Sequence, residues 1–203
     1  MYGIMRKVNL SFLNINVKIV EKMPMKTILI SLLLISVFNV FSQGTLKSEE
    51  YDMSISYPEG WEHNAGVKGQ GEVLFNLSDK RQKAKDMKLA ISCTVVVEEA
   101  KFGGDIDEMI AAYHLKLKNR PELDKQKVTS KKIVTVSGVK AVDIVGTAEI
   151  PIIKQATTWR ILLFEYKGTY FEIGAVASKK EFKKKEVQTD IEFLFKSITL
   201  GLK

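Results

Sequence analysis

The sequence predicts a single α+β domain in which an antiparallel β-sheet is flanked by helices. One observation is a series of apolar segments that alternate with period two, as half-buried strands do. Another is a pair of two-residue turns, Ser137-Gly138 and Lys167-Gly168, each of which joins two such segments. The third is helical spacing of apolar residues after Asp105 and after Lys180. Because hairpins make neighbouring strands antiparallel, this order of elements indicates an antiparallel sheet with helices packed on it.

The first part of the domain is expected to be mostly strand. Residues 51–57 alternate and stop at Pro58-Glu59-Gly60, where proline in the second position and glycine in the fourth predict a type I turn. Trp61 is expected to pack back onto the sheet. Further strands are predicted over residues 72–77 and 89–98, with a glycine-containing loop over 63–71 and a charged connection over 79–88.

A helix is predicted to follow Asp105, which is a suitable N-cap residue. Glu108 stands at the third position and would complete an acidic capping box, and Pro121 marks the end of the helix. Four strands then follow, over residues 128–136, 139–150, 155–166 and 169–177. A second helix is predicted over about residues 180–198, with one apolar face.

A secretory signal peptide is predicted over residues 25–42. Lys26 supplies the positive start, an apolar run follows, and Ser42 is the small residue that precedes cleavage before Gln43. A membrane-spanning helix needs about 20 apolar residues, more than this run supplies, so the cleaved chain is expected not to span a membrane. Residues 1–24 are interpreted as an over-long start or an extended positive region, which leaves residues 43–203 as the domain.

Cys93 is the single cysteine of the chain. An intramolecular disulfide is therefore excluded, and so is a bacterial lipoprotein, whose acylated cysteine directly follows the cleavage site. Cys93 shares one strand face with Ile91, Val95 and Val97, which favours a buried, unreactive thiol.

The basic charge of the chain lies largely in the segment that is predicted to be removed. The full chain carries a net charge of +7. Residues 1–42 hold five basic residues and one acidic residue, so the domain that remains carries +3. This modest charge does not support a nucleic-acid partner.

No catalytic or metal-binding constellation is recognisable. The two histidines, His63 and His114, are far apart in the sequence, and neither has a neighbouring ligand pattern. The glycines of the segment 66–71 precede a strand, whereas a phosphate-binding loop runs into a helix. We therefore predict no catalytic residues, no metal ligands and no cofactor.

The strongest local feature is a run of lysines near the C-terminus, which we call the lysine patch. It consists of Lys179, Lys180, Lys183, Lys184 and Lys185. Such a run could attract anionic lipid headgroups, lipopolysaccharide or an acidic protein, or it could simply be the solvated start of a helix. Because cations at a helix N-terminus oppose the helix dipole, the run is mildly unfavourable for folding.

Several of these segments resemble PsbP-like domains. The resemblance is carried by YDMSISYPEGW (51–61), the capped helix at Asp105, VTVSGVKAVDIVGTA (134–148) and LLFEYKGTYFEIGAVAS (162–178), in that order. The resemblance spans about residues 51–198. Over this range the chain is similar to exported bacterial envelope proteins. The resemblance implies an αβα sandwich and a family that mostly assists or binds other proteins, without shared catalytic residues.

Taken together, the sequence favours an exported, non-catalytic binding or accessory module of the bacterial cell envelope. Its partner would be a protein or an envelope component, and its location the periplasm or the exterior. Two alternatives remain open at this stage: a periplasmic enzyme of unknown reaction, and a carrier of an apolar ligand between sheet and helices. The sequence assigns no oligomeric state.

Overall fold

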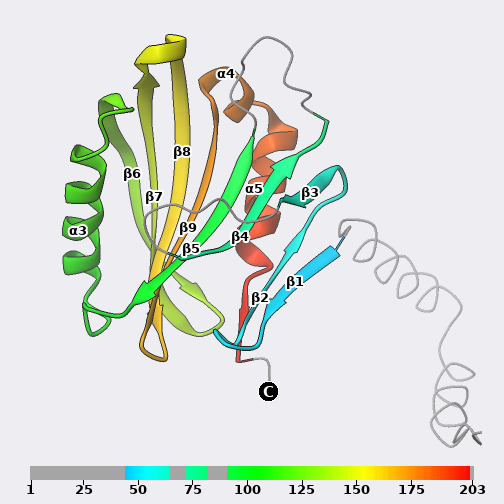
Figure 1. Cartoon of the computed structure of the whole chain (residues 1–203), viewed down its shortest axis with the longest axis vertical. Coiled ribbons are helices and arrows are strands. Elements are labelled where there is room, and N and C mark those ends of the chain that lie inside the picture. The colour runs from blue at the N-terminus through cyan, green and yellow to red at the C-terminus, as the bar shows by residue number, and fades with distance from the viewer. Residues whose placement is uncertain (1–43, 65–71, 82–90, 202–203) are drawn as a thin grey trace, which may run out of the picture. The chain divides into compact units, whose positions relative to one another are not determined.

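A seven-stranded antiparallel sheet forms the centre of the fold (Figure 1). The computed structural model describes residues 44–64, 72–81 and 91–201. The chain divides into two units, Met1–Phe41 and Ser42–Lys203, and every described residue belongs to the second. The predictions for residues 1–24 and 25–42 lie outside the described residues, as do the segment 66–71 and residues 82–88 of the charged connection.

The strands of the large sheet lie in the order β3-β4-β5-β9-β8-β7-β6, and β1, β2 and β10 form a second, three-stranded sheet. In chain order, the elements are β1 (Gly44–Ser48), β2 (Met53–Tyr57), β3 (Trp61–Asn64), β4 (Glu72–Asp79), β5 (Ser92–Glu99), α3 (Ile106–Lys118), β6 (Asp124–Val136), β7 (Val139–Ile150), η1 (Pro151–Ile153), β8 (Gln155–Tyr166), β9 (Thr169–Ser178), α4 (Lys179–Phe182), α5 (Lys185–Lys196) and β10 (Thr199–Leu200).

Two tight hairpins fix the register of the last four long strands. Ser137 and Gly138 have φ angles of 46° and 84°, and Lys167 and Gly168 have φ angles of 47° and 77°. Two successive residues with positive φ make a type I′ turn, whose twist matches that of antiparallel strands. Val136 consequently pairs with Val139, and Tyr166 pairs with Thr169. Both predicted hairpins are confirmed.

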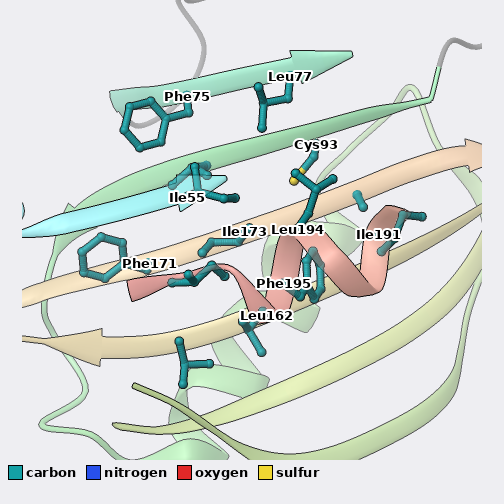
Figure 2. Packing of buried hydrophobic residues seen from close by; sticks show 14 of the residues in the cluster. Ile55, Phe75, Leu77, Cys93, Leu162, Phe171, Ile173, Ile191, Leu194 and Phe195 are labelled. Atoms are coloured by element: carbon teal, nitrogen blue, oxygen red, sulfur yellow. The ribbon is translucent and has the colours of Figure 1, made fainter. Parts of the chain in front are cut away.

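The large sheet carries a hydrophobic layer on each face, because successive residues of its strands point to opposite sides. Leu162 belongs to one core cluster and Leu163 to the other. The Leu163 cluster includes the apolar side of α3, whereas the Leu162 cluster includes the apolar side of α5 and residues of β2. In Figure 2, Leu194 and Phe195 of α5 lie close to Ile173 and Cys93 of the sheet. Each face of the sheet thus packs with one of the two longer helices.

Asp105 caps α3 as predicted, but the capping box is only half formed. The Asp105 carboxylate accepts hydrogen bonds from the backbone N–H groups of Asp107 at 2.8 Å and Glu108 at 3.1 Å. The Asp105 N–H donates to the Phe102 carbonyl at 2.9 Å, which leaves no need for the Glu108 side chain to accept it. The N-cap is confirmed, and the role predicted for Glu108 is wrong.

The predicted C-terminal helix over 180–198 is in fact two helices. Lys184 has an extended backbone, with φ −67° and ψ 132°, and separates α4 from α5. In a continuous helix, Phe182 and Val187 would lie about 140° apart around the axis. The break at Lys184 allows both side chains to contact the same core layer. Packing of these two residues therefore overrides helical continuity.

The turn between β2 and β3, which belong to different sheets, also differs from the prediction. The Trp61 N–H donates to the Pro58 carbonyl at 3.2 Å, so the turn runs from Pro58 to Trp61, one residue later than expected. Gly60 then occupies the third position with φ 86°, a value that a type II turn requires there. Trp61 does pack inward, since its side chain is fully buried. His63, expected in a loop, lies in β3.

The predicted fold class is confirmed at the level of antiparallel sheets combined with helices. The short strands β1 and β10 were not expected from the sequence. Within the described part of the chain, no helix has the length and apolar character that crossing a membrane requires.

Candidate functional site

The lysine patch lies where β9 passes into the two C-terminal helices. Ser178 ends β9 and caps α4, since its hydroxyl accepts a hydrogen bond from the Glu181 N–H at 3.2 Å. The single turn of α4 carries Lys179 and Lys180, and Lys183 and Lys184 form the link to α5. All five lysines of the patch are exposed. The sequence prediction thus identified five exposed cations that lie on one short stretch of the surface.

Most of this positive charge lacks an internal counterion. Lys184 pairs with Glu181 at 2.5 Å. Nearby Glu186 pairs with Arg81. Among the described residues, no carboxylate forms an ion pair with Lys179, Lys180, Lys183 or Lys185. The patch therefore presents a surplus of positive charge to solvent.

A groove of about 770 Å³ begins at the lysine patch. One wall is α5, with Lys185 at its start, and the other is β6, which contributes Lys132 and Val134. Asp143 of β7 and Arg160 of β8 lie between the two walls. Lys185 belongs both to the patch and to the groove, so the two features form one continuous surface.

A second cavity of about 250 Å³ extends the groove along α5. It shares Val134, Asp143, Arg160 and Glu192 with the first. Its far end is fixed by Ser137, whose hydroxyl donates to the Ile198 carbonyl at 3.1 Å and accepts from the Leu200 N–H at 3.2 Å. These bonds attach the β6–β7 turn to the chain that follows α5.

Arg160 is the central polar group of the groove. Its Nε and Nη2 atoms donate to the carboxylate of Asp143, at 3.0 and 2.7 Å, and its Nη1 atom donates to Glu192 at 2.6 Å. The guanidinium carbon lies 5.0 Å from the centre of the Phe195 ring. Burial lowers the pKa of Arg160, but the hydrogen bonds to Asp143 and Glu192 outweigh it and raise the pKa above the usual arginine value.

The position of α5 is set by a second arginine. Arg81 donates through Nε to Asp79 at 2.8 Å and also contacts Asp190 and Glu186 of α5. Trp61 Nε1 donates to Asp190 at 3.1 Å. The hydrogen bond to Asp79 is the main reason that the pKa of Arg81 is raised. Residues from β3 and from the end of β4 thereby hold the helix that forms one wall of the groove.

Among the described residues, His63 and His114 lie far from each other, and neither belongs to a cluster of potential metal ligands. His63 lies on β3, where its ring packs edge-on against Phe75 with the ring centres 6.5 Å apart. His114 is exposed on α3, which packs on the other face of the sheet. No group of three or more histidine, cysteine, aspartate or glutamate residues in the described ranges could hold a metal ion. Cys93 is fully buried, and burial raises the pKa of its thiol to about 12.

Asp143, Arg160 and Glu192 were not predicted as site residues from the sequence. A signal for the first two was present, because Asp143 interrupts the apolar run of one strand and Arg160 that of the next. Their ion pair could not be inferred, since it depends on the register in which Val145 of β7 faces Arg160 of β8. Glu192 comes from a separate helix, whose placement the sequence does not specify.

The arrangement of this sheet and its helices is found in several solved structures. PsbP (CyanoP) of Synechocystis sp. PCC 6803 superposes with a TM-score of 0.56 at 9% identity, over 80% of this chain and 94% of that one. The chain has a PsbP-like fold. Comparison by sequence finds no family model and no curated protein that matches it.

The same fold occurs in two further proteins. The Ran-binding protein Mog1p of Saccharomyces cerevisiae gives a TM-score of 0.57 at 12% identity, over 79% of this chain and 96% of that one. LpqN of Mycobacterium tuberculosis, a protein involved in cell envelope biogenesis, gives 0.54 at 12% identity, over 73% and 82%. At these identities the likeness concerns the PsbP-like fold alone.

Proposed function

We propose that this protein is an exported, non-catalytic binding module of the bacterial cell envelope, and that its lysine patch binds an anionic partner. The observation that carries the proposal is the group of exposed lysines that have no counterion in the described structure: Lys179, Lys180, Lys183 and Lys185. Like charges held close together on a surface repel one another, and an acidic partner would relieve that repulsion.

The fold supports a binding role. Mog1p is described as a Ran-binding protein and LpqN as a participant in cell envelope biogenesis, and both have the PsbP-like fold. A helix–sheet–helix sandwich of the PsbP-like kind would supply a rigid scaffold on which α4 and the start of α5 present the patch. Export is supported by the signal-like pattern of residues 25–42, with cleavage expected before Gln43.

The proposal is tested by comparing two charge-matched variants of the protein made in its native host. The first replaces Lys179, Lys180 and Lys183 with glutamine, and the control replaces Lys101, Lys118 and Lys154, which are also exposed but lie outside the patch. Tagged protein is crosslinked in cells, and the captured partners are quantified. We expect the patch variant to lose a partner that the control retains.

Equal capture by the two variants would contradict the assignment to the patch. The N-terminal residue of the purified protein tests export separately, because a chain that begins at Gln43 and fractionates with the periplasm or the medium has been processed and exported. A lipid that co-purifies in equimolar amount would favour the carrier of an apolar ligand instead.

A further inference from the structure

We infer that the groove between α5 and β6 binds an extended acidic segment of a protein partner. The inference rests on the proposed function, because Lys185 joins the groove to the lysine patch. It goes further in naming the conformation and the chemistry of the segment that binds.

The first support is the edge of the large sheet. Among the described strands, β6 pairs only with β7, so the other side of this 13-residue strand is unpaired. Lys131 and Lys132 lie exposed in the middle of β6, and Lys132 lines the groove. Lysines on an edge strand repel a second copy of the same edge and attract an acidic segment.

The second support is the size and direction of the groove. Its β6 wall runs from Ser130 to Val136, a distance of about 20 Å at the usual rise of a strand. Its α5 wall runs from Lys185 to Lys196, about 17 Å at the rise of a helix. A segment of about five or six extended residues would fill this length.

The third support is the charge of the lining. The groove and its extension are lined by four cations, Lys132, Arg160, Lys185 and Lys196, and by two carboxylates, Asp143 and Glu192. Asp143 is 8% exposed and forms a two-point ion pair with Arg160, and Glu192 contacts both Arg160 and Lys196. The two carboxylates offset two of the four cations, so the lining keeps a net charge of +2.

Arg160 has the geometry of a preorganised carboxylate receptor. Asp143 and the Phe195 ring hold the plane of its guanidinium in place. Its Nη1 atom faces Glu192, whose side chain is 42% exposed and also contacts Lys196 at 3.1 Å. A carboxylate of the partner can take the place of Glu192 at Nη1, while Glu192 keeps Lys196 as its counterion. In the absence of the partner, Glu192 thus occupies the position that the ligand would take.

These features favour a polypeptide over a lipid surface. The Arg160 side chain is only 22% exposed and lies between the walls of the groove, where a flat layer of headgroups does not reach.

The test uses a fluorescent short peptide of alternating glutamate and valine as the probe, with anisotropy as the readout. A lysine–valine peptide and anionic phosphatidylglycerol vesicles serve as comparisons. We expect binding of the glutamate peptide alone.

Two protein variants, with a control on α3, test the groove. Glu192→Gln removes the internal competitor for Arg160, and we expect it to tighten peptide binding on the order of threefold. Lys132→Gln should weaken binding, whereas Lys118→Gln on α3 should not. Unchanged or weaker binding by Glu192→Gln, or preference for vesicles, would overturn the inference. The capture experiment on the patch would still decide the proposed function independently.

Discussion

Arg160 of β8 and Asp143 of β7 form a two-point ion pair in which Nε lies 3.0 Å from Oδ1 and Nη2 lies 2.7 Å from Oδ2. Asp143 is buried, whereas the other partner of Arg160, Glu192, is half exposed. The arginine is therefore fixed on its strand side and accessible on its helix side. The ion pair thus links two strands of the sheet and also forms the floor of the groove.

Asp143→Asn should destabilise the protein, because it leaves the partly buried Arg160 with only the exposed Glu192 as a counterion. We expect a loss of about 1–3 kcal/mol in the free energy of unfolding, measured with urea. Glu149→Gln is the control, since Glu149 pairs with Lys125 at an exposed site of the same strand and should cost less than about 0.5 kcal/mol. Similar losses in the two variants would contradict the structural role of the pair.

Gly146→Ala should destabilise the protein, because a Cβ atom at this buried position would overlap the ring of Trp159, its partner across β7 and β8. The rigid ring must shift, at a cost of about 1–3 kcal/mol. Gly174→Ala is the matched control, since its Cβ would lie 3.5 Å from Ile161, an ordinary contact. Thermal unfolding should separate the two variants, and a neutral Gly146→Ala would show that Trp159 is not packed as described.

Cys93 should be inert to thiol reagents in the folded protein. Its side chain is fully buried, and with a pKa of about 12 only about one thiol in ten thousand is ionised near pH 8. Labelling with a chromogenic disulfide reagent should therefore be negligible in buffer and complete in denaturant. Rapid stoichiometric labelling of the native protein would contradict the burial of Cys93 beneath α5.

The sequence predicted those parts of the fold that depend on neighbouring residues. The hairpins at Ser137-Gly138 and Lys167-Gly168, the Asp105 cap and the inward face of Cys93 all follow from local patterns. The turn at Gly60 was displaced by one residue because several turn types tolerate the same proline and glycine. Long-range pairing was beyond reach: β10 is two residues long and forms only because its partner β2 lies beside it.

The candidate site, like the fold, could be predicted only where it depends on neighbouring residues in the sequence. The lysine patch was visible as a run of residues and lies exposed as expected, although a binding role for it stays a prediction. The groove was not visible, because Arg160, Asp143 and Glu192 come from β8, β7 and α5. The break at Lys184 was also missed, since it results from the packing of Phe182 and Val187 on one core layer.

Glu192 should titrate below its ordinary pKa of 4.5, mainly because it accepts a hydrogen bond from Arg160; burial opposes this shift, and Lys196 adds to it. A lowered pKa in the folded state means that the unfolded chain binds more protons in this range. The contribution of Glu192 to stability is thus present above the unfolded pKa and is lost as the pH falls through the folded one. Because the Glu192 side chain is 42% exposed, the contribution should not exceed about 1 kcal/mol.

Carboxyl carbon shifts followed by NMR during an acid titration would measure this pKa. In Glu192→Gln, the stability should depend less steeply on pH below about 4.5 than in the parent protein. A pKa for Glu192 at or above its ordinary value would show that Arg160 does not hold it in solution.

The most direct test of the binding function is site-specific photocrosslinking in the native envelope. A photoreactive residue placed at Lys183, in the patch, is compared with one at Lys118, on α3. The account predicts one reproducible protein adduct at position 183, reduced at high salt and absent at position 118. Adducts of equal yield at both positions, or at position 118 alone, would contradict a partner-binding site at the lysine patch.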